Sequence, residues 1–111
     1  MLPKSQRLNL KTDFKWVASG KKIESRYLKL FIRWGENKTP RVGIAVSSRI
    51  FKKATERNRV KRLVSQAVQS IIHDLPSTIN IVALPKQSIL NVKSGDVLLD
   101  VESKLKDEKI I

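Results

Sequence analysis

Four basic side chains lie within six residues of one predicted helix. The stretch TERNRVKRLVSQAVQS spans residues 55–70, and its cations are Arg57, Arg59, Lys61 and Arg62. Arginine donates paired hydrogen bonds to phosphate oxygens, and the first turn of a helix has free backbone amides that also attract phosphate. Cations placed there oppose the helix dipole by about 0.3–1 kcal/mol each at exposed sites. The pattern therefore indicates a polyanionic partner.

The segment before this helix strengthens the cluster. SSRIFKK, residues 47–53, adds three more cations, so that seven lie within fourteen residues. With about 100° between successive residues, the helix points its cations in several directions around its first turns. Arg57 falls on the buried side, where its long side chain can still reach the surface.

The charge of the whole chain follows the same trend. The net charge is +13, and residues 1–62 hold 18 Lys and Arg against 4 Asp and Glu, whereas residues 63–111 hold 5 against 6. Surfaces that serve solubility alone mix the two signs. RNA, DNA or an anionic membrane is therefore the expected partner. The membrane is the weaker alternative, because the apolar stripe of the basic helix is needed for the core.

A strand with two different faces is predicted at YLKLFIRW, residues 27–34. Leu28, Leu30 and Ile32 alternate with Tyr27, Lys29, Phe31 and Arg33. This period of two places aromatic and basic side chains on one face. Such a face suits base stacking and phosphate contacts, and it equally suits a strand whose aromatics cover a neighbouring helix.

The remaining patterns give a small α/β protein of one domain, residues 1–111. Thr12 is expected to cap a first helix that ends at Gly20, and RVGIAVSS, residues 41–48, is expected to form a hairpin with the preceding strand. Gly43 leaves room there for a close neighbour. The long helix begins near Thr55 and carries an apolar stripe to Ile72, INIVAL is a buried strand, and Ser94 is expected to cap a last helix. Helices against one mixed sheet, with a crossover through the long helix, make a two-layer sandwich.

Catalytic and metal-binding patterns are sparse. The chain has no cysteine and one histidine, His73, which is expected to lie on the surface or at a helix end. The sequence has neither a phosphate-binding lysine loop nor a dinucleotide glycine triplet. No apolar run approaches the roughly 20 residues that cross a bilayer, and the N-terminus lacks the apolar core of a signal peptide. The sequence predicts a soluble cytoplasmic protein without its own catalytic centre.

Arg57-Asn58-Arg59, followed by Lys61-Arg62 and preceded by the strand RVGIAVS, resembles the signature of the bacterial ribonuclease P protein subunit. SQRLNLKTDFKWV near the N-terminus, Gly20, YLKLFIRW and INIVALPK are also similar to that family. The resemblance implies a fold like the second domain of ribosomal protein S5, with a left-handed crossover through the helix that carries RNR.

The resemblance also implies a function. The family works inside a ribonucleoprotein whose RNA subunit uses Mg²⁺ to cleave the 5′ leader from precursor tRNA. The expected partners are this catalytic RNA and precursor tRNA, the protein is expected to be monomeric there, and the protein alone is expected to bind no metal. The residues expected to bind RNA are Arg49, Lys52, Lys53, Arg57, Asn58, Arg59, Lys61 and Arg62. The residues expected to line the leader cleft are Phe14, Lys15, Phe31 and Arg33.

The chain departs from the family pattern at a few positions. Ser65 and Gln66 stand where the family commonly has an arginine and an acidic residue, Ala18 stands where an aromatic is often found, and Ser48 where a lysine is frequent. A non-catalytic RNA-binding protein of the ribosomal type is the alternative function, because the same charge serves it without the RNR pattern.

Overall fold

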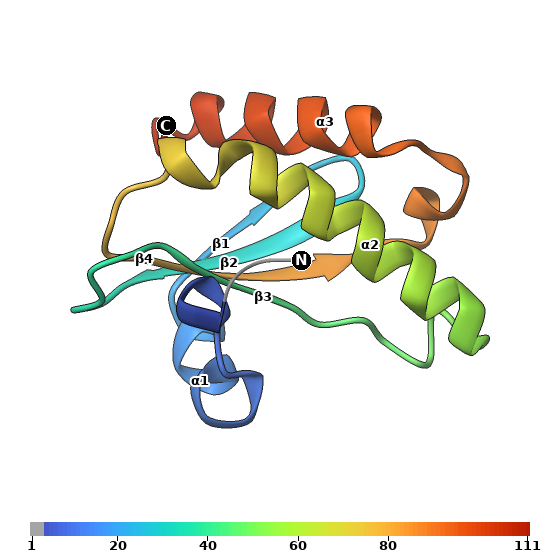
Figure 1. Ribbon diagram of the computed structural model, residues 1–111, viewed down its shortest axis with the longest axis horizontal. Coiled ribbons are helices and arrows are strands. Elements are labelled where there is room, and N and C mark those ends of the chain that lie inside the picture. The colour runs from blue at the N-terminus through green and yellow to red at the C-terminus, as the bar shows by residue number, and fades with distance from the viewer. Residues whose placement is uncertain (1–3) are drawn as a thin grey trace.

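The computed structural model describes residues 4–111 and contains a four-stranded sheet with helices on both sides (Figure 1). The helices are α1 (Leu10–Ala18), α2 (Ala54–Ile71) and α3 (Ser94–Asp107), and the strands are β1 (Lys21–Glu24), β2 (Leu28–Trp34), β3 (Arg41–Ile44) and β4 (Ile79–Pro85). Three short 3₁₀ helices, Lys4–Gln6, Ile72–Asp74 and Gln87–Asn91, lie before α1, after α2 and before α3.

The strand order in the sheet is β1-β2-β4-β3. β2 is antiparallel to both β1 and β4, whereas β3 and β4 are parallel and are joined through α2. The predicted mixed sheet and crossover are confirmed. The predicted hairpin between β2 and β3 is wrong, because β4 lies between these two strands. β4 takes this central place because both of its faces are apolar, with Ile79, Ile81 and Ala83 on one side and Val82 on the other.

One face of the sheet carries the main core. α2 and α3 lie side by side on this face, and the predicted stripe of α2 is buried from Val60 to Ile72. Leu28, Leu30 and Ile32 of β2 point into the same core. Burial of this stripe holds α2 against the sheet, so the direction of its N-terminal end is set by packing rather than by its cations.

The other face of the sheet, here called the outer face, is only partly covered. Val17 of α1 and Leu8 pack on Val82, and Phe14 and Phe31 lie half-buried around them. Gly43 confirms the expected close neighbour, because a Cβ there would lie 2.6 Å from Leu10 Cδ2. The segment that leads into α1 therefore crosses this face directly over β3.

Helix ends differ from the sequence predictions in detail. Asn9 caps α1 in place of Thr12, and its Oδ1 accepts a hydrogen bond from the Lys11 amide at 3.1 Å. Lys93 is the cap position of α3 in place of Ser94, and its amide donates to the Asp96 carboxylate at 3.1 Å. Gly20 follows α1 without a positive φ. It is needed for space instead, since a Cβ there would collide with the carbonyl oxygen of Ile32.

β1 was not predicted. Its sequence KKIE has only one apolar residue, Ile23, which is too short a pattern to distinguish a strand from a loop. Pairing with β2 through a tight turn at residues 25–27 makes it an edge strand. Charged side chains on an edge strand are a common protection against pairing with another chain.

Candidate nucleic-acid interface

The basic helix of the sequence prediction is α2, and its N-terminal end extends past the sheet (Figure 1). Asn58, Arg59, Lys61 and Arg62 are exposed, whereas Arg57 is half-buried. Within residues 4–111, the side chains of Asn58, Lys61 and Arg62 make neither a hydrogen bond nor a salt bridge. These three side chains are available to a partner.

Arg57 has a different role from its neighbours. Its Nη1 donates to the carbonyl oxygens of Phe51 and Lys52, at 2.9 and 3.0 Å. Both carbonyls belong to the connection between β3 and α2. The guanidinium thus holds this connection against the first turn of α2, which explains why the residue lies on the buried side of the helix.

Arg59 also bonds to the backbone, although it is exposed. Its Nε donates to the carbonyl of Leu90 at 3.3 Å and its Nη2 to that of Val92 at 3.5 Å. These carbonyls lie just before α3. Arg59 therefore links the N-terminal end of α2 to a segment 31 residues further along the chain, and its remaining N–H groups can still meet a phosphate.

The connection before α2 places three more cations. Arg49, Lys52 and Lys53 are exposed, while Phe51 between them is fully buried in the main core. The amide of Phe51 donates to the carbonyl of Ser47 at 2.9 Å, and the amide of Arg49 donates to Ser47 Oγ at 3.2 Å. This buried aromatic and these two bonds fix a turn that carries the cations outward.

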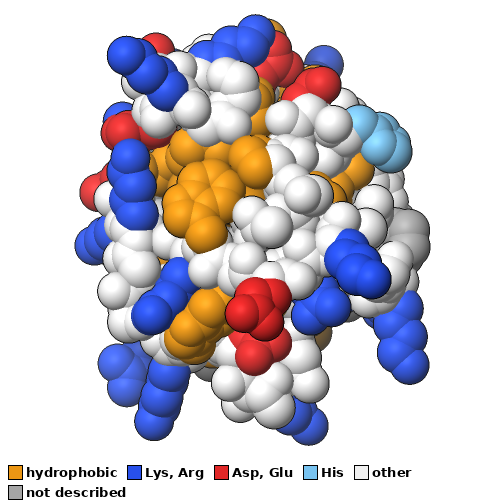
Figure 2. All heavy atoms as spheres, turned by 90° about the vertical axis from the view of Figure 1, so that its left-hand side faces the viewer, with side chains coloured by type: hydrophobic (Ala, Val, Ile, Leu, Met, Phe, Trp, Pro, Cys, Tyr) orange, Lys and Arg blue, Asp and Glu red, His pale blue; other side chains and the backbone are white. Residues whose placement is uncertain are grey.

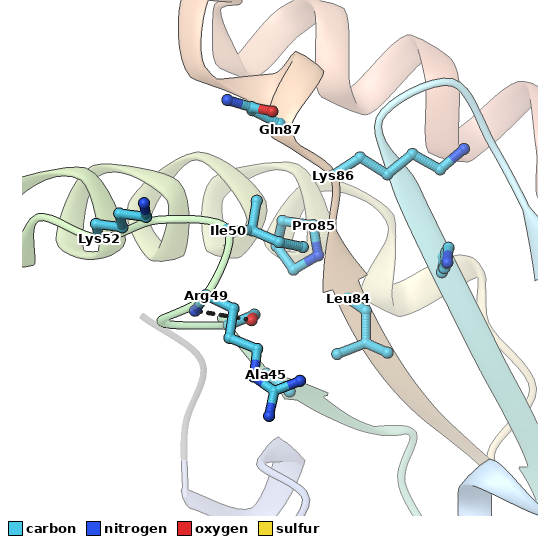
Figure 3. A pocket seen from close by; sticks show the side chains of 10 residues that line it. Ala45, Arg49, Ile50, Lys52, Leu84, Pro85, Lys86 and Gln87 are labelled. Atoms are coloured by element: carbon cyan, nitrogen blue, oxygen red, sulfur yellow. Dashed lines mark hydrogen bonds between the residues drawn. The ribbon is translucent and has the colours of Figure 1, made fainter.

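A large hollow lies beside this turn, at the C-terminal end of β4 (Figure 3). Its volume is about 610 Å³. The apolar residues that line it are Ala45, Ile50, Leu84 and Pro85, and the cations are Lys29, Arg49, Lys52 and Lys86. A hollow with an apolar surface and cations around it can take bases on its floor and phosphates at its edge.

The residues predicted for the leader cleft lie elsewhere on the outer face. Phe14 and Phe31 belong to the small cluster under α1, and Lys22 Nζ lies 5.9 Å from the centre of the Phe31 ring. Lys15 is exposed on α1. Arg33 Nη1 donates to Ser19 Oγ at 2.6 Å and to the Trp16 carbonyl at 3.2 Å. The structure brings Arg49 and Lys52 together in the hollow, but these four residues do not line it.

Sequence analysis missed Lys86 as a residue of this surface. It lies at the end of β4, remote in sequence from the basic cluster, and only the folded sheet brings it near Arg49. Lys29 was recognised on the basic face of β2 but was not assigned to a site. Its pairing with Leu84 across β2 and β4 places it in the same hollow. A pattern within one strand does not show which residue of a neighbouring strand lies opposite.

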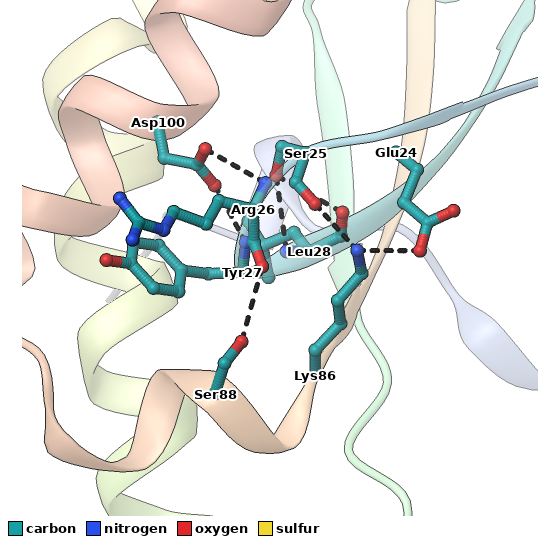
Figure 4. A network of polar contacts seen from close by, with 8 residues as sticks. All are labelled: Glu24, Ser25, Arg26, Tyr27, Leu28, Lys86, Ser88 and Asp100. Atoms are coloured by element: carbon teal, nitrogen blue, oxygen red, sulfur yellow. Dashed lines mark hydrogen bonds and ion pairs between the residues drawn. The ribbon is translucent and has the colours of Figure 1, made fainter.

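Lys86 is held by a polar network at the turn between β1 and β2 (Figure 4). Its Nζ lies 2.6 Å from Glu24 Oε1 and donates to the Ser25 carbonyl at 2.7 Å. The hydrogen bond and the charge of Lys86 lower the pKa of Glu24 below its usual value. Desolvation opposes this shift, and the charges of Lys29 and Lys22 add smaller effects that lower the pKa. Asp100 of α3 accepts from the amides of Arg26 and Tyr27, at 3.0 and 2.9 Å, and so fixes the turn.

Acidic and histidine side chains do not gather into a catalytic or metal centre in residues 4–111. No group of three or more His, Cys, Asp or Glu side chains is close enough to hold a metal ion there. His73 is exposed in the 3₁₀ helix after α2, at the opposite end of α2 from the cations. The same residues contain no helix with the length and apolar character that a membrane span requires.

Comparison with known proteins decides which family this basic surface belongs to. The family model for Ribonuclease P matches residues 2–108. The chain belongs to the ribonuclease P protein family. The Ribonuclease P protein component of Pseudanabaena sp. (strain PCC 6903) is 37% identical over 84 residues, which cover 74% of this chain and 72% of the relative. That of Blochmanniella pennsylvanica (strain BPEN) is 30% identical over 98 residues, which cover 87% and 78%.

A solved structure agrees with the family. The RNase P protein from Thermotoga maritima, in complex with 1-(4-fluorophenyl)-2-thiourea, superposes with a TM-score of 0.79 at 28% identity, over 90% of this chain and 97% of that one. The predicted family and fold class are thus confirmed. The chain is a ribonuclease P protein component, an accessory subunit of an endoribonuclease that matures the 5′ ends of tRNAs.

Proposed function

We propose that this protein binds the catalytic RNA of ribonuclease P through the N-terminal end of α2 and the turn before it. The residues assigned to this contact are Arg49, Lys52, Lys53, Arg57, Asn58, Arg59, Lys61 and Arg62. The observation that carries the proposal is the exposed group of cations, of which Arg49, Lys52, Lys53, Lys61 and Arg62 have no side-chain partner within residues 4–111. Phosphate oxygens are the acceptors that would satisfy them.

The 5′ leader of precursor tRNA is assigned to the outer face of the sheet. Phe14, Lys15, Phe31 and Arg33 offer aromatic and basic surface there, and the hollow beside Arg49 continues this surface. Single-stranded RNA binds by stacking bases on apolar or aromatic floors while cations follow its backbone. Both RNAs are assigned to one domain, residues 1–111. The reason is that Arg49 belongs to the basic turn before α2 and also lines the hollow that continues the leader surface.

Cleavage is assigned to the RNA subunit with Mg²⁺ that the RNA holds. Acidic side chains in residues 4–111 do not gather into a set that would cage this ion. The protein contributes positive charge, which lets two RNA molecules approach each other at lower Mg²⁺. We place the protein as one copy per catalytic RNA, in the cytoplasm where tRNA is matured.

The test is cleavage of a precursor tRNA by a bacterial ribonuclease P RNA at low Mg²⁺, with and without the protein. Stimulation is expected, and its absence would refute the proposed function. Competition between leader-bearing and leaderless tRNA separates this function from that of a ribosomal-type RNA-binding protein, which would bind both equally. Arg49→Ala is expected to reduce the preference for the leader. Lys106→Ala on α3 changes the net charge equally and should leave the preference unchanged.

A further inference from the structure

A second hollow lies on the outer face, at the N-terminal end of β4. Its volume is about 320 Å³, and the residues that line it include Asp13, Trp16, Gly35, Glu36, Arg41 and Asn80. Strand register explains the grouping, because Asn80 of β4 pairs with Arg33 of β2 and with Arg41 of β3. Figure 2 faces the end of the molecule that holds the loop between β2 and β3, where hydrophobic side chains reach the surface with acidic and basic side chains beside them.

Asn80 is the unusual residue of this hollow. It is only 3% exposed, and its Nδ2 donates to Asn37 Oδ1 at 2.9 Å and to the Arg33 carbonyl at 3.3 Å. Asn37 is itself fixed, because its Nδ2 donates to three backbone carbonyls, among them that of Thr39 at 2.7 Å. The amide of Asn80 therefore has one orientation.

This orientation leaves one acceptor without a partner. No donor within residues 4–111 bonds to Asn80 Oδ1, which lies on the opposite side of the amide from Asn37. No fully buried side-chain nitrogen or oxygen in residues 4–111 lacks a hydrogen-bond partner, so Asn80 Oδ1 is reached by solvent. A ligand in the hollow that brings an N–H donor would replace solvent at this acceptor.

The other polar groups of the hollow also favour a ligand rich in donors. Asp13 and Glu36 add two carboxylates, whereas Arg41 is the one cation that lines it. Arg33 lies close by, but its guanidinium is bonded to α1 and stacks on the Trp16 ring, 5.0 Å from the ring centre. In a chain with a net charge of +13, this is a poor site for a bare phosphate.

Trp16 gives the hollow an aromatic wall. Its side chain is 38% exposed, and it approaches Asn80 across Gly35. A Cβ at Gly35 would lie 2.9 Å from Trp16 Cη2 and 2.8 Å from Asn80 Nδ2. Exposed aromatic rings beside hydrogen-bonding side chains are the usual means by which proteins hold unpaired RNA bases.

We propose that this hollow binds a guanine base of single-stranded RNA. Guanine carries two adjacent donors, the ring N1–H and the 2-amino group, which match a carboxylate such as Asp13, and the amino group has a second hydrogen for Asn80 Oδ1. Adenine and cytosine have an amino group without the adjacent ring N–H, and uracil has the ring N–H alone. Arg41 is placed to meet the phosphate of the same nucleotide. The hollow lies on the same outer face, but none of the residues assigned to the leader lines it, so the inference goes beyond the proposed function.

The test uses the protein alone with single nucleotides and follows the indole N–H signal of Trp16 by NMR. The chain has one other tryptophan, Trp34, which does not line the hollow, and Trp34→Phe identifies the Trp16 signal. Guanosine 5′-monophosphate is expected to shift this signal to saturation. The shift should require about tenfold more adenosine 5′-monophosphate, as the loss of one carboxylate-to-base hydrogen bond implies.

Asp13→Asn should remove the preference for guanosine over adenosine monophosphate, and Glu102→Gln on α3 is the control with the same change of charge. Equal response to both nucleotides, or a preference that survives in Asp13→Asn, would overturn the proposal. Saturation by inorganic phosphate alone would reassign the site to an anion, and saturation by Mg²⁺ alone to a metal ion. Failure here would leave stimulation of cleavage intact, so that the two proposals fail separately.

Discussion

Arg57 and Arg62 stand five residues apart in the same basic cluster, yet the structure gives them opposite surroundings. Arg57 bonds two backbone carbonyls of the connection before α2, whereas the Arg62 side chain is exposed and has no partner within residues 4–111. Arg59 is intermediate, since it is exposed and makes two long bonds to carbonyls before α3. A run of cations in sequence therefore contains two kinds of residue. Some, such as Arg57, hold the backbone of the binding surface in place, and others, such as Arg62, present their side chains to a partner.

The largest effect is expected for Arg57→Ala. The substitution leaves the carbonyls of Phe51 and Lys52 without their charged donor, and such bonds contribute about 1.5–3 kcal/mol. Since Arg57 is partly exposed and water can replace some of this, we expect the free energy of unfolding to fall by about 2 kcal/mol in urea denaturation. RNA affinity should fall as well, because the turn with Arg49, Lys52 and Lys53 loses its support. Unchanged stability would show that Arg57, like Arg62, does not support the backbone of this turn.

Arg59→Ala should give a mixed result. Its bonds to Leu90 and Val92 are long and exposed, so we expect a loss of about 0.5–1 kcal/mol in the free energy of unfolding. The salt dependence of RNA binding should also become shallower by roughly one unit of slope, if one phosphate contact is lost. A loss of stability without any change of slope would mean that Arg59 holds the backbone in place and does not contact phosphate.

Arg62→Ala should affect RNA binding alone. Surface substitutions without specific contacts usually change stability by less than about 0.5 kcal/mol. The slope of the logarithm of affinity against the logarithm of salt concentration should fall by roughly one unit. Filter binding to ribonuclease P RNA at several salt concentrations measures this slope. If the slope stays the same, Arg62 does not meet phosphate, and the contrast with Arg57 disappears.

The smallest effect is expected for Glu24→Gln. The substitution releases Lys86 from its ion pair and should raise the affinity for leader-bearing RNA by a few-fold at low salt. Glu102→Gln on α3, which changes the net charge equally and releases Lys106 from a similar ion pair, is the control. The pKa of Glu24 is lowered in the folded protein, so the ion pair stabilises the fold above the unfolded-state pKa. This stabilisation is lost as the pH falls through the folded-state pKa. Equal affinity gains in the two variants would mean that Lys86 has no special role.

Sequence patterns predicted the structural features that depend on one helix or one strand alone. The apolar stripe of α2, the two faces of β2 and the burial of β4 all follow from periodicity, and the structure confirms them. The order of strands does not follow from periodicity, because an antiparallel hairpin of β2 with β3 satisfies the same patterns as the observed insertion of β4. The unpredicted strand β1 carries a single buried residue and so had no period to detect.

The candidate site was predictable in part for the same reason. The basic cluster was visible as a run of residues, and the position of Arg57 on the buried side of α2 indicated a distinct environment. Its acceptors were not visible, because they depend on the path of the chain around Phe51. Asn80 lies in β4 and Lys86 directly follows it, and only strand pairing brings Asn80 beside β2 and β3 and Lys86 beside Lys29. A site whose residues come from three separate strands gives no recognisable motif in the sequence of any one strand.

The insertion of β4 between β2 and β3 has a consequence for the order in which the protein is made. β4 is the last strand of the sheet in the chain, and it occupies an inner position. A ribosome therefore completes the 18 Lys and Arg side chains of residues 1–62 before it makes the strand that joins β3 to the rest of the sheet. Until residue 85 has emerged, the nascent chain has its full excess of positive charge without the sheet that spaces it. During synthesis there is thus a stage at which the basic residues have been made but the complete sheet cannot yet form.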